Sequence, residues 1–179
     1  MKRSHLAREI VETLALALLI FLAVHFTVQN YQIDGFSMQN TLQNSQYVLV
    51  NKIAYLFHAP ERGDVIVFHE PDQPDRDLIK RVIGLPGDKI TMDSTNIWVN
   101  GTELHEPYIT APSNPPTQPI TVPANDYFVL GDNRPNSEDS RYFGPVPRDN
   151  IVGKATLVDW PFNQWQFLNT YTSVYAQIK

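Results

Sequence analysis

Two short segments of the chain place reactive side chains in unusual surroundings. In residues 34–38 (Asp-Gly-Phe-Ser-Met) the Ser37 hydroxyl stands between two large apolar side chains, which a solvated loop does not ordinarily expose. In residues 78–83 strand alternation puts Lys80 on one face and Arg81 on the other, so one of the two cations must border a core. Arginine stays charged in proteins, whereas a desolvated lysine can lose its proton. Lys80 is therefore the cation that could become a neutral base, and two cations snorkelling from an edge strand are the alternative interpretation.

Other chemistries have little support in the sequence. The five histidines are scattered singly, without the i, i+4 pairing of a helical zinc site, so no metal site is expected. The Gly-Leu-Pro-Gly segment at residues 84–87 lacks the Lys-Ser/Thr ending of a phosphate loop. The chain has no cysteine, which excludes disulfides, thiolate metal sites and cysteine nucleophiles. A carboxylate pair for acid–base work is a weaker alternative, because the candidates are interleaved with arginines as in salt-bridged loops: Asp132, Glu138 and Asp139 among Arg134 and Arg141.

The composition predicts one β-rich domain of catalytic size. Of the 179 residues 42% are hydrophobic and 18% are charged, and 14 prolines stand against 8 glycines. This composition can form a core but is too irregular for a helical bundle, so strands and loops should dominate. The formal net charge of −5 argues against a nucleic-acid partner bound through its phosphates.

An apolar stretch near the N-terminus is expected to hold this domain at a membrane. Residues 10–28 contain only Glu12 and His25 as strongly polar members, and as a helix they would extend roughly 28 Å, close to the thickness of a bilayer core. No small-x-small cleavage site follows the stretch. An uncleaved single-pass anchor is therefore favoured over a cleaved signal peptide or a buried helix.

The charges around this stretch predict its orientation. Three cations precede it, whereas residues 29–32 directly after it carry no positive charge; the three are Lys2, Arg3 and Arg8. By the positive-inside rule, residues 1–9 should be cytoplasmic and residues 29–179 should form an extracytoplasmic domain at the plasma (inner) membrane.

Apolar runs bounded by turn-forming residues predict at least six short strands, at residues 47–50, 65–68, 78–83, 97–99, 127–130 and 151–158. Asn100-Gly101 supplies the positive-φ positions of a type I′ hairpin turn. Six prolines between residues 107 and 123 remove ladder donors, so an extended surface loop is expected there. The C-terminal tail is rich in aromatic residues, which could lie at a membrane interface but more commonly pack on a core: Trp160, Phe162, Trp165, Phe167, Tyr171 and Tyr175.

Together these features resemble the type I signal peptidases, membrane-anchored serine proteases of the Ser–Lys dyad class. The resemblance covers most of the chain, since the anchor is followed by four motifs in the family's order. They are Ser-Met-Gln-Asn-Thr-Leu at residues 37–42, Gly-Asp-Val-Ile-Val-Phe at 63–68, Lys-Arg-Val-Ile-Gly-Leu-Pro-Gly-Asp at 80–88, and Gly-Asp-Asn at 131–133 with Ser137, Asp139, Ser140 and Arg141.

The resemblance implies a role for each matching residue. Ser37 corresponds to the nucleophile, Lys80 to the general base, and Ser137 to a hydroxyl that helps to orient the lysine amine. Four further residues resemble supporting parts of the family's site: Asp139 and Arg141 an ion pair, and Asp132 and Asn133 a turn beneath the site.

Two positions near the nucleophile need comment. The family usually has proline where this chain has Asn40, so the turn after Ser37 loses a fixed φ. Some members carry an oxyanion-stabilising serine where this chain has Gly35, as other branches of the family do. The resemblance then implies an oxyanion hole made of backbone amides, chiefly that of Ser37.

The implied protein has a mainly β fold after one transmembrane helix. It would cleave signal peptides from exported preproteins after small residues (Ala-x-Ala type), through an acyl-enzyme and without a cofactor. Membrane lipid would be its other partner. Two alternatives are weighed against this function: a Ser–Lys protease of the self-cleaving repressor type, whose DNA-binding region this chain lacks, and a non-catalytic membrane-anchored β domain that binds secreted proteins.

Overall fold

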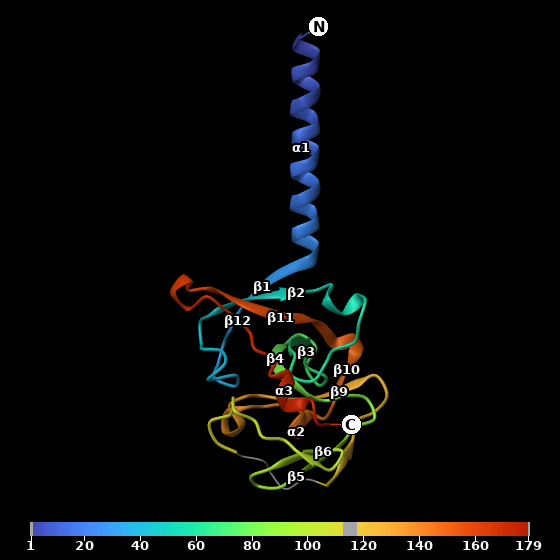
Figure 1. Ribbon diagram of the computed structural model, residues 1–179, viewed down its shortest axis with the longest axis vertical. Coiled ribbons are helices and arrows are strands. Elements are labelled where there is room, and N and C mark those ends of the chain that lie inside the picture. The colour runs from blue at the N-terminus through green and yellow to red at the C-terminus, as the bar shows by residue number, and fades with distance from the viewer. Residues whose placement is uncertain (1, 113–117, 179) are drawn as a thin grey trace.

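An apolar helix opens the chain and projects away from the remaining elements in the computed structural model, which describes residues 2–112 and 118–178 (Figure 1). This helix, α1 (Lys2–Thr27), contains a 20-residue stretch, Arg8–Thr27, that is long and apolar enough to cross a membrane. Its large apolar side chains are exposed, as lipid-facing side chains would be. The helix ends at Thr27, one residue earlier than expected, because Val28 begins the first strand.

The strands nearest the helix belong to the larger of two sheets (Figure 1). All pairings within this sheet are antiparallel. In spatial order it contains β1 (Val28–Gln32), β2 (Tyr47–Asn51), β11 (Ile151–Trp160), β3 (Val65–His69), β4 (Asp77–Gly84), β9 (Asp126–Leu130) and β10 (Val146–Pro147), with β12 (Gln166–Phe167) paired to β11.

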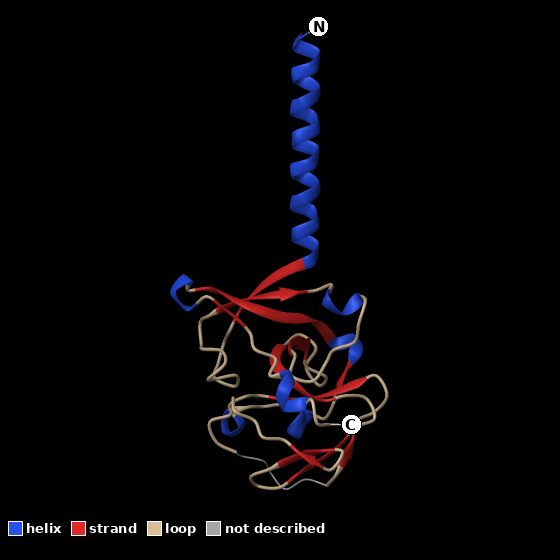
Figure 2. Cartoon of the chain, in the orientation of Figure 1, coloured by secondary structure: helices blue, strands red, loops and turns tan. Residues whose placement is uncertain are grey.

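A smaller antiparallel sheet lies at the end of the domain away from α1 (Figure 1). Its order is β7 (Thr102–Glu103), β6 (Ile97–Val99), β5 (Lys89–Met92) and β8 (Ile120–Thr121). Short helical turns connect the strands (Figure 2): η1 (Ala54–Leu56), η2 (Arg134–Asn136), α2 (Ser140–Phe143), η3 (Arg148–Asn150), η4 (Phe162–Gln164) and α3 (Thr172–Tyr175).

The six strands expected from the apolar runs are all present, as β2, β3, β4, β6, β9 and β11. The hairpin turn is also confirmed, because Asn100 and Gly101 both have positive φ (52° and 81°) between β6 and β7. The expectation for residues 107–123 was wrong in part, since β8 pairs with β5 and Val122 is buried. β8 itself contains no proline, since Pro119 and Pro123 lie on either side of it, and it is the last strand in the smaller sheet. Residues 113–117 of that segment lie outside the described residues.

The aromatic tail divides into two parts. Tyr171 and Tyr175 pack against the core cluster beneath the smaller sheet. The four residues before them, in and around η4, are exposed: Trp160 (49%), Phe162 (75%), Trp165 (53%) and Phe167 (70%). Packing therefore accounts for the last two of the six aromatic residues but not for the first four.

Candidate active site

Ser37 lies in the loop that joins β1 to β2, and buried apolar side chains fix this loop. Met38 and Leu42 are 1% and 0% exposed and belong to the core cluster that includes Val48 and Val65. The Leu42 amide also donates a 2.8 Å hydrogen bond to the Met38 carbonyl, which closes a turn just after Ser37. Hydrophobic burial on both sides of that turn therefore sets the position of the hydroxyl.

Gly35 gives the same loop the backbone conformation it needs. Its φ is +106°, in the region that favours glycine, and its amide donates to the Asn44 side chain at 2.8 Å. The Gly35 amide is thus already used within the loop. In the described part of the chain, no protein acceptor is bonded to the Ser37 amide.

Lys80 projects from β4 to the Ser37 hydroxyl. Its Nζ donates to Ser37 Oγ at 2.8 Å and to the Ile79 carbonyl oxygen at 2.9 Å, and the residue is only 2% exposed. Desolvation by burial is the main reason that the pKa of Lys80 is lowered from 10.5 to about 8. The Asp139 charge opposes this shift, and the Arg76 charge acts in the same direction as burial. The base predicted from the sequence is therefore beside the predicted nucleophile.

Both cations of the Lys80–Arg81 pair are buried, so the expectation that one of them borders a core holds for each of the two. Arg81 is fully buried and forms a two-pronged ion pair with Asp132, at 2.9 Å from Nε to Oδ1 and 2.7 Å from Nη2 to Oδ2. The guanidinium also donates to the Gly63 and Asn169 carbonyls. Strand alternation sends the two cations to opposite faces, but the second face is also covered.

The Asp132–Asn133 turn is hydrogen-bonded to the loop that carries Ser37. The Asn133 amide donates to the Ser37 carbonyl and the Asn133 side chain donates to the Phe36 carbonyl, each at 3.0 Å. Asp132 accepts a hydrogen bond from the Thr41 hydroxyl, on the other side of the loop. The turn therefore lies against the loop that carries Ser37, and its role in catalysis stays a prediction.

Ser137 and Asp139 form a second buried support. Asp139 pairs with Arg141 (Oδ1 to Nε, 2.7 Å), and both side chains are fully buried. Among the described residues the Ser137 hydroxyl donates to Asp139 at 2.6 Å, and Lys80 is not one of its partners. An orienting role of Ser137 toward the lysine amine stays a prediction. Gly131 is required here, since a Cβ would lie 2.2 Å from Ser137 Oγ and 2.5 Å from the Ser37 carbonyl oxygen.

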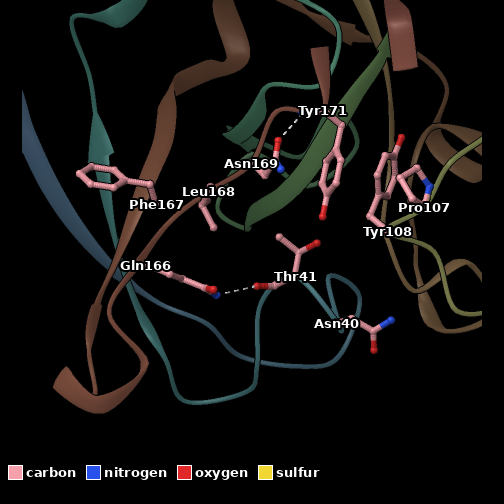
Figure 3. Close-up of a pocket in the computed structure, with 9 residues that line it drawn as sticks. All are labelled: Asn40, Thr41, Pro107, Tyr108, Gln166, Phe167, Leu168, Asn169 and Tyr171. Carbon is pink, nitrogen blue, oxygen red and sulfur yellow. Dashed lines mark hydrogen bonds between the residues drawn. The ribbon is translucent and has the colours of Figure 1, made fainter. Parts of the chain in front are cut away.

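Ser37 and Lys80, here called the reactive pair, lie in a groove between two strand edges. Residues 31–34 form one wall and residues 77–80 the other, and the cavity measures about 110 Å³. β4 pairs with β9 only from Arg81 onward, and β1 is the first strand of its sheet, so the described strands leave both edges unpaired along the groove. A larger cavity of about 230 Å³, shown in Figure 3, is lined by other residues of the nucleophile loop, Asn40 and Thr41, and not by the reactive pair.

The sequence did not predict the contacts that three residues of this site make. Arg81 and Thr41 both bind Asp132, and Arg76 bridges Glu70 and Glu138. The sequence signal available for Arg81 was its place in a Lys-Arg pair within one strand, together with a carboxylate two residues after the end of another strand. A strand pattern does not specify such pairs, because they depend on which strands are neighbours in the sheet.

Comparisons with known proteins identify the family of this chain. The chain matches the family model described as "Signal peptidase, peptidase S26" over residues 6–160. It is 40% identical to "Signal peptidase I" of Leptolyngbya laminosa, over 86% of this chain and 80% of that protein. It is 36% identical to "Signal peptidase IB" of Staphylococcus aureus (strain MRSA252), over 83% of this chain and 86% of that protein. A crystal structure of a signal peptidase I from Enterococcus faecalis V583 is 37% identical, with a TM-score of 0.46, and the match covers 54% of this chain and 96% of that one.

The β-rich domain behind one apolar helix confirms the predicted fold class. The chain belongs to the signal peptidase family, peptidase S26. The predicted class of enzyme, a serine endopeptidase and hence a hydrolase, is confirmed with it.

Proposed function

We propose that this chain cleaves signal peptides from exported preproteins with Ser37 as nucleophile and Lys80 as general base. The observation that carries the proposal is the 2.8 Å contact between a nearly fully buried amine and a serine hydroxyl. A lysine with a pKa of about 8 is neutral in about a tenth of molecules at pH 7, against roughly one in three thousand for an ordinary lysine. Burial thus supplies a usable fraction of free base.

The reaction follows from the positions of these two groups. Ser37 Oγ attacks the scissile carbonyl carbon while its proton passes to Lys80 Nζ. The oxyanion that forms is stabilised by the Ser37 amide. Collapse of the tetrahedral intermediate breaks the C–N bond, the ammonium protonates the leaving amine, and an ester acyl-enzyme remains. Water then attacks the ester while Lys80 accepts its proton, and the C–O bond to Ser37 breaks as the Lys80 ammonium returns that proton to Ser37 Oγ, which releases the acid product and restores both groups.

The groove suits an extended peptide. A substrate strand between residues 31–34 and 77–80 would hydrogen-bond to both unpaired edges and would so complete the sheet. Alternate side chains of an extended peptide point to the same face, so the first and third residues before the cut would point into the same part of the groove. The apolar side chains that narrow it, Ile33, Val67 and Ile79, favour small residues at those two positions.

The exposed aromatic residues around η4 support contact with lipid. The η4 turn lies at the end of the domain where α1 joins it (Figure 1). Tryptophan and phenylalanine are favourable at the bilayer interface because their rings are amphipathic or apolar. We propose that this turn rests in the outer interface while residues 1–9 are cytoplasmic, residues 10–28 span the membrane, and residues 29–179 are extracytoplasmic.

A peptide assay on the full chain in detergent micelles tests this function. A peptide with alanine at the first and third positions before the bond should be cleaved, and the same peptide with leucine at either position should be cleaved poorly. Ser37→Ala should lower the rate by roughly a thousandfold or more. Ser94→Ala, at an exposed serine in the turn between β5 and β6, is the matched control and should be fully active. Equal cleavage by wild type and Ser37→Ala would refute the proposal and favour the non-catalytic β domain.

A further inference from the structure

Arg76 bridges two carboxylates beside the reactive groove. Its Nη1 lies 3.1 Å from Glu70 Oε2 and 2.8 Å from Glu138 Oε2. Glu70 directly follows β3, and Glu138 follows Ser137 in the segment that supports the site. The Glu70 amide also donates to the Arg76 carbonyl at 2.9 Å, which closes the β3–β4 loop around the guanidinium. One side chain therefore joins the β3–β4 loop to the Ser137–Asp139 segment.

We propose that Arg76 is a positioning residue for the peptidase site, where its charge balances the Glu70 and Glu138 carboxylates that it bridges and so keeps the Lys80 amine available as a base. This inference rests on the proposed function, because it assumes that Lys80 is the general base. Arg76 itself contacts neither Ser37 nor Lys80, so it acts through the electrostatic potential at the amine.

The charged groups around Lys80 make this balance necessary. Asp139 is paired with Arg141 and accepts a hydrogen bond from the Ser137 hydroxyl, and its charge still raises the pKa of Lys80. Asp34 and Asp77 line the same groove as Lys80, and Asp77 is 2.6 Å from His69. Two further carboxylates that act on the amine are those of Glu70 and Glu138, and Arg76 is their shared cation.

The direction of each contribution is opposite for the cation and the carboxylates. After burial and Asp139, the Arg76 charge lowers the pKa of Lys80, whereas the Glu138 and Glu70 charges raise it. Removal of Arg76 should therefore raise this pKa, since the positive charge that offsets the two carboxylates is lost. Removal of the Glu138 charge should lower it.

The test is the pH dependence of peptide cleavage by the full chain in detergent, whose acid limb reports protonation of the base. Arg76→Gln should move the midpoint of that limb upward by about half a pH unit, a modest shift because the guanidinium is partly exposed and screened. Glu138→Gln should move it downward. Arg76→Lys should restore most of the wild-type profile, and all three differences should shrink in high salt. Lys89→Gln is the control, since it changes the net charge equally at an exposed site in the smaller sheet.

The rate on the alkaline plateau separates a positioning role from a structural one. Arg76→Gln leaves Glu70, which is 2% exposed, without this ion-pair partner, and this variant should also unfold at lower denaturant concentration. Glu138 is half exposed, so Glu138→Gln should keep the wild-type unfolding midpoint and still shift the limb. Opposite shifts with plateau rates near wild type support the inference. Superimposed acid limbs for wild type, Arg76→Gln and Glu138→Gln overturn it, while an acid limb that survives in Lys80→Met overturns the proposed function instead.

Discussion

Replacement of Lys80 by methionine tests whether the amine acts as a base or as a structural cation. Methionine has a side chain of similar length and volume that carries no charge. Because the pKa of Lys80 is lowered from 10.5 to about 8, the folded chain holds this proton less tightly than the unfolded chain does. At about 1.4 kcal/mol per pH unit, the protonated lysine destabilises the folded state by about 3 kcal/mol below pH 8.

The pH window of this cost follows from the two pKa values. The cost is complete below pH 8, shrinks between pH 8 and 10.5, and is absent above the unfolded value. Methionine removes it, but it also removes the hydrogen bonds to Ser37 Oγ and the Ile79 carbonyl, which costs about 1–3 kcal/mol for each buried group left unpaired. At neutral pH the variant should therefore be about as stable as wild type while peptide cleavage is lost.

The assay compares guanidinium unfolding of the two full chains in detergent, followed by tryptophan fluorescence, between pH 7 and pH 10.5. The free energy of unfolding of wild type minus that of Lys80→Met should increase by about 3 kcal/mol from pH 7 to pH 10.5, since the cost of the protonated lysine disappears over this range. All other titrating groups are the same in both chains and cancel in this difference. Normal cleavage by Lys80→Met would refute the assignment of the base. An inactive variant that is several kcal/mol less stable at every pH would identify Lys80 as a structural ion-pair residue.

Three further predictions test the anchor, the nucleophile loop and the buried ion pair. Protease added outside intact cells should digest the chain beyond Asn30, and protection of that region until the membrane is permeabilised would reverse the proposed topology. Asn40→Pro should leave peptide cleavage equal or modestly higher, because the Asn40 amide donates no hydrogen bond to a described residue; a large loss would assign this amide or side chain a role. Asp132→Asn should lower the free energy of unfolding by about 3–5 kcal/mol, since Arg81 is left buried and unpaired, whereas the exposed control Asp149→Asn should change it little.

Strand positions were predictable from the sequence because each long strand carries its own pattern. β3 and β4 are apolar runs bounded by polar or turn residues, and the Asn100-Gly101 turn has a local backbone requirement. The short strands β8, β10 and β12 have two residues each, too few for any period to be visible. Their existence depends on a longer neighbouring strand that offers a free edge.

The candidate site was predictable only where chemistry and motif coincide in one segment. Lys80 was identifiable because a lysine within an apolar strand that borders a core is desolvated, and a desolvated lysine can lose its proton. The bond between Asn133 and the Ser37 carbonyl joins residues far apart in the chain, and no local pattern encodes it. Arg76 has the same difficulty, since its sequence neighbours are polar and typical of a solvated loop, yet its partner Glu70 is buried.

The different surroundings of two adjacent cations explain why this strand can carry a base. Arg81 and Lys80 are both buried on β4, and burial disfavours the charge of each. Arg81 has a carboxylate in direct contact, so its charge is retained and ties β4 to the turn that holds Ser37. Lys80 has only a hydroxyl and a carbonyl within hydrogen-bonding distance, and the Asp139 carboxylate that acts on it from further away is already paired with Arg141. Since neither contact carries a full negative charge, the desolvation of Lys80 is only partly offset, and a lysine at this position can release its proton near neutral pH.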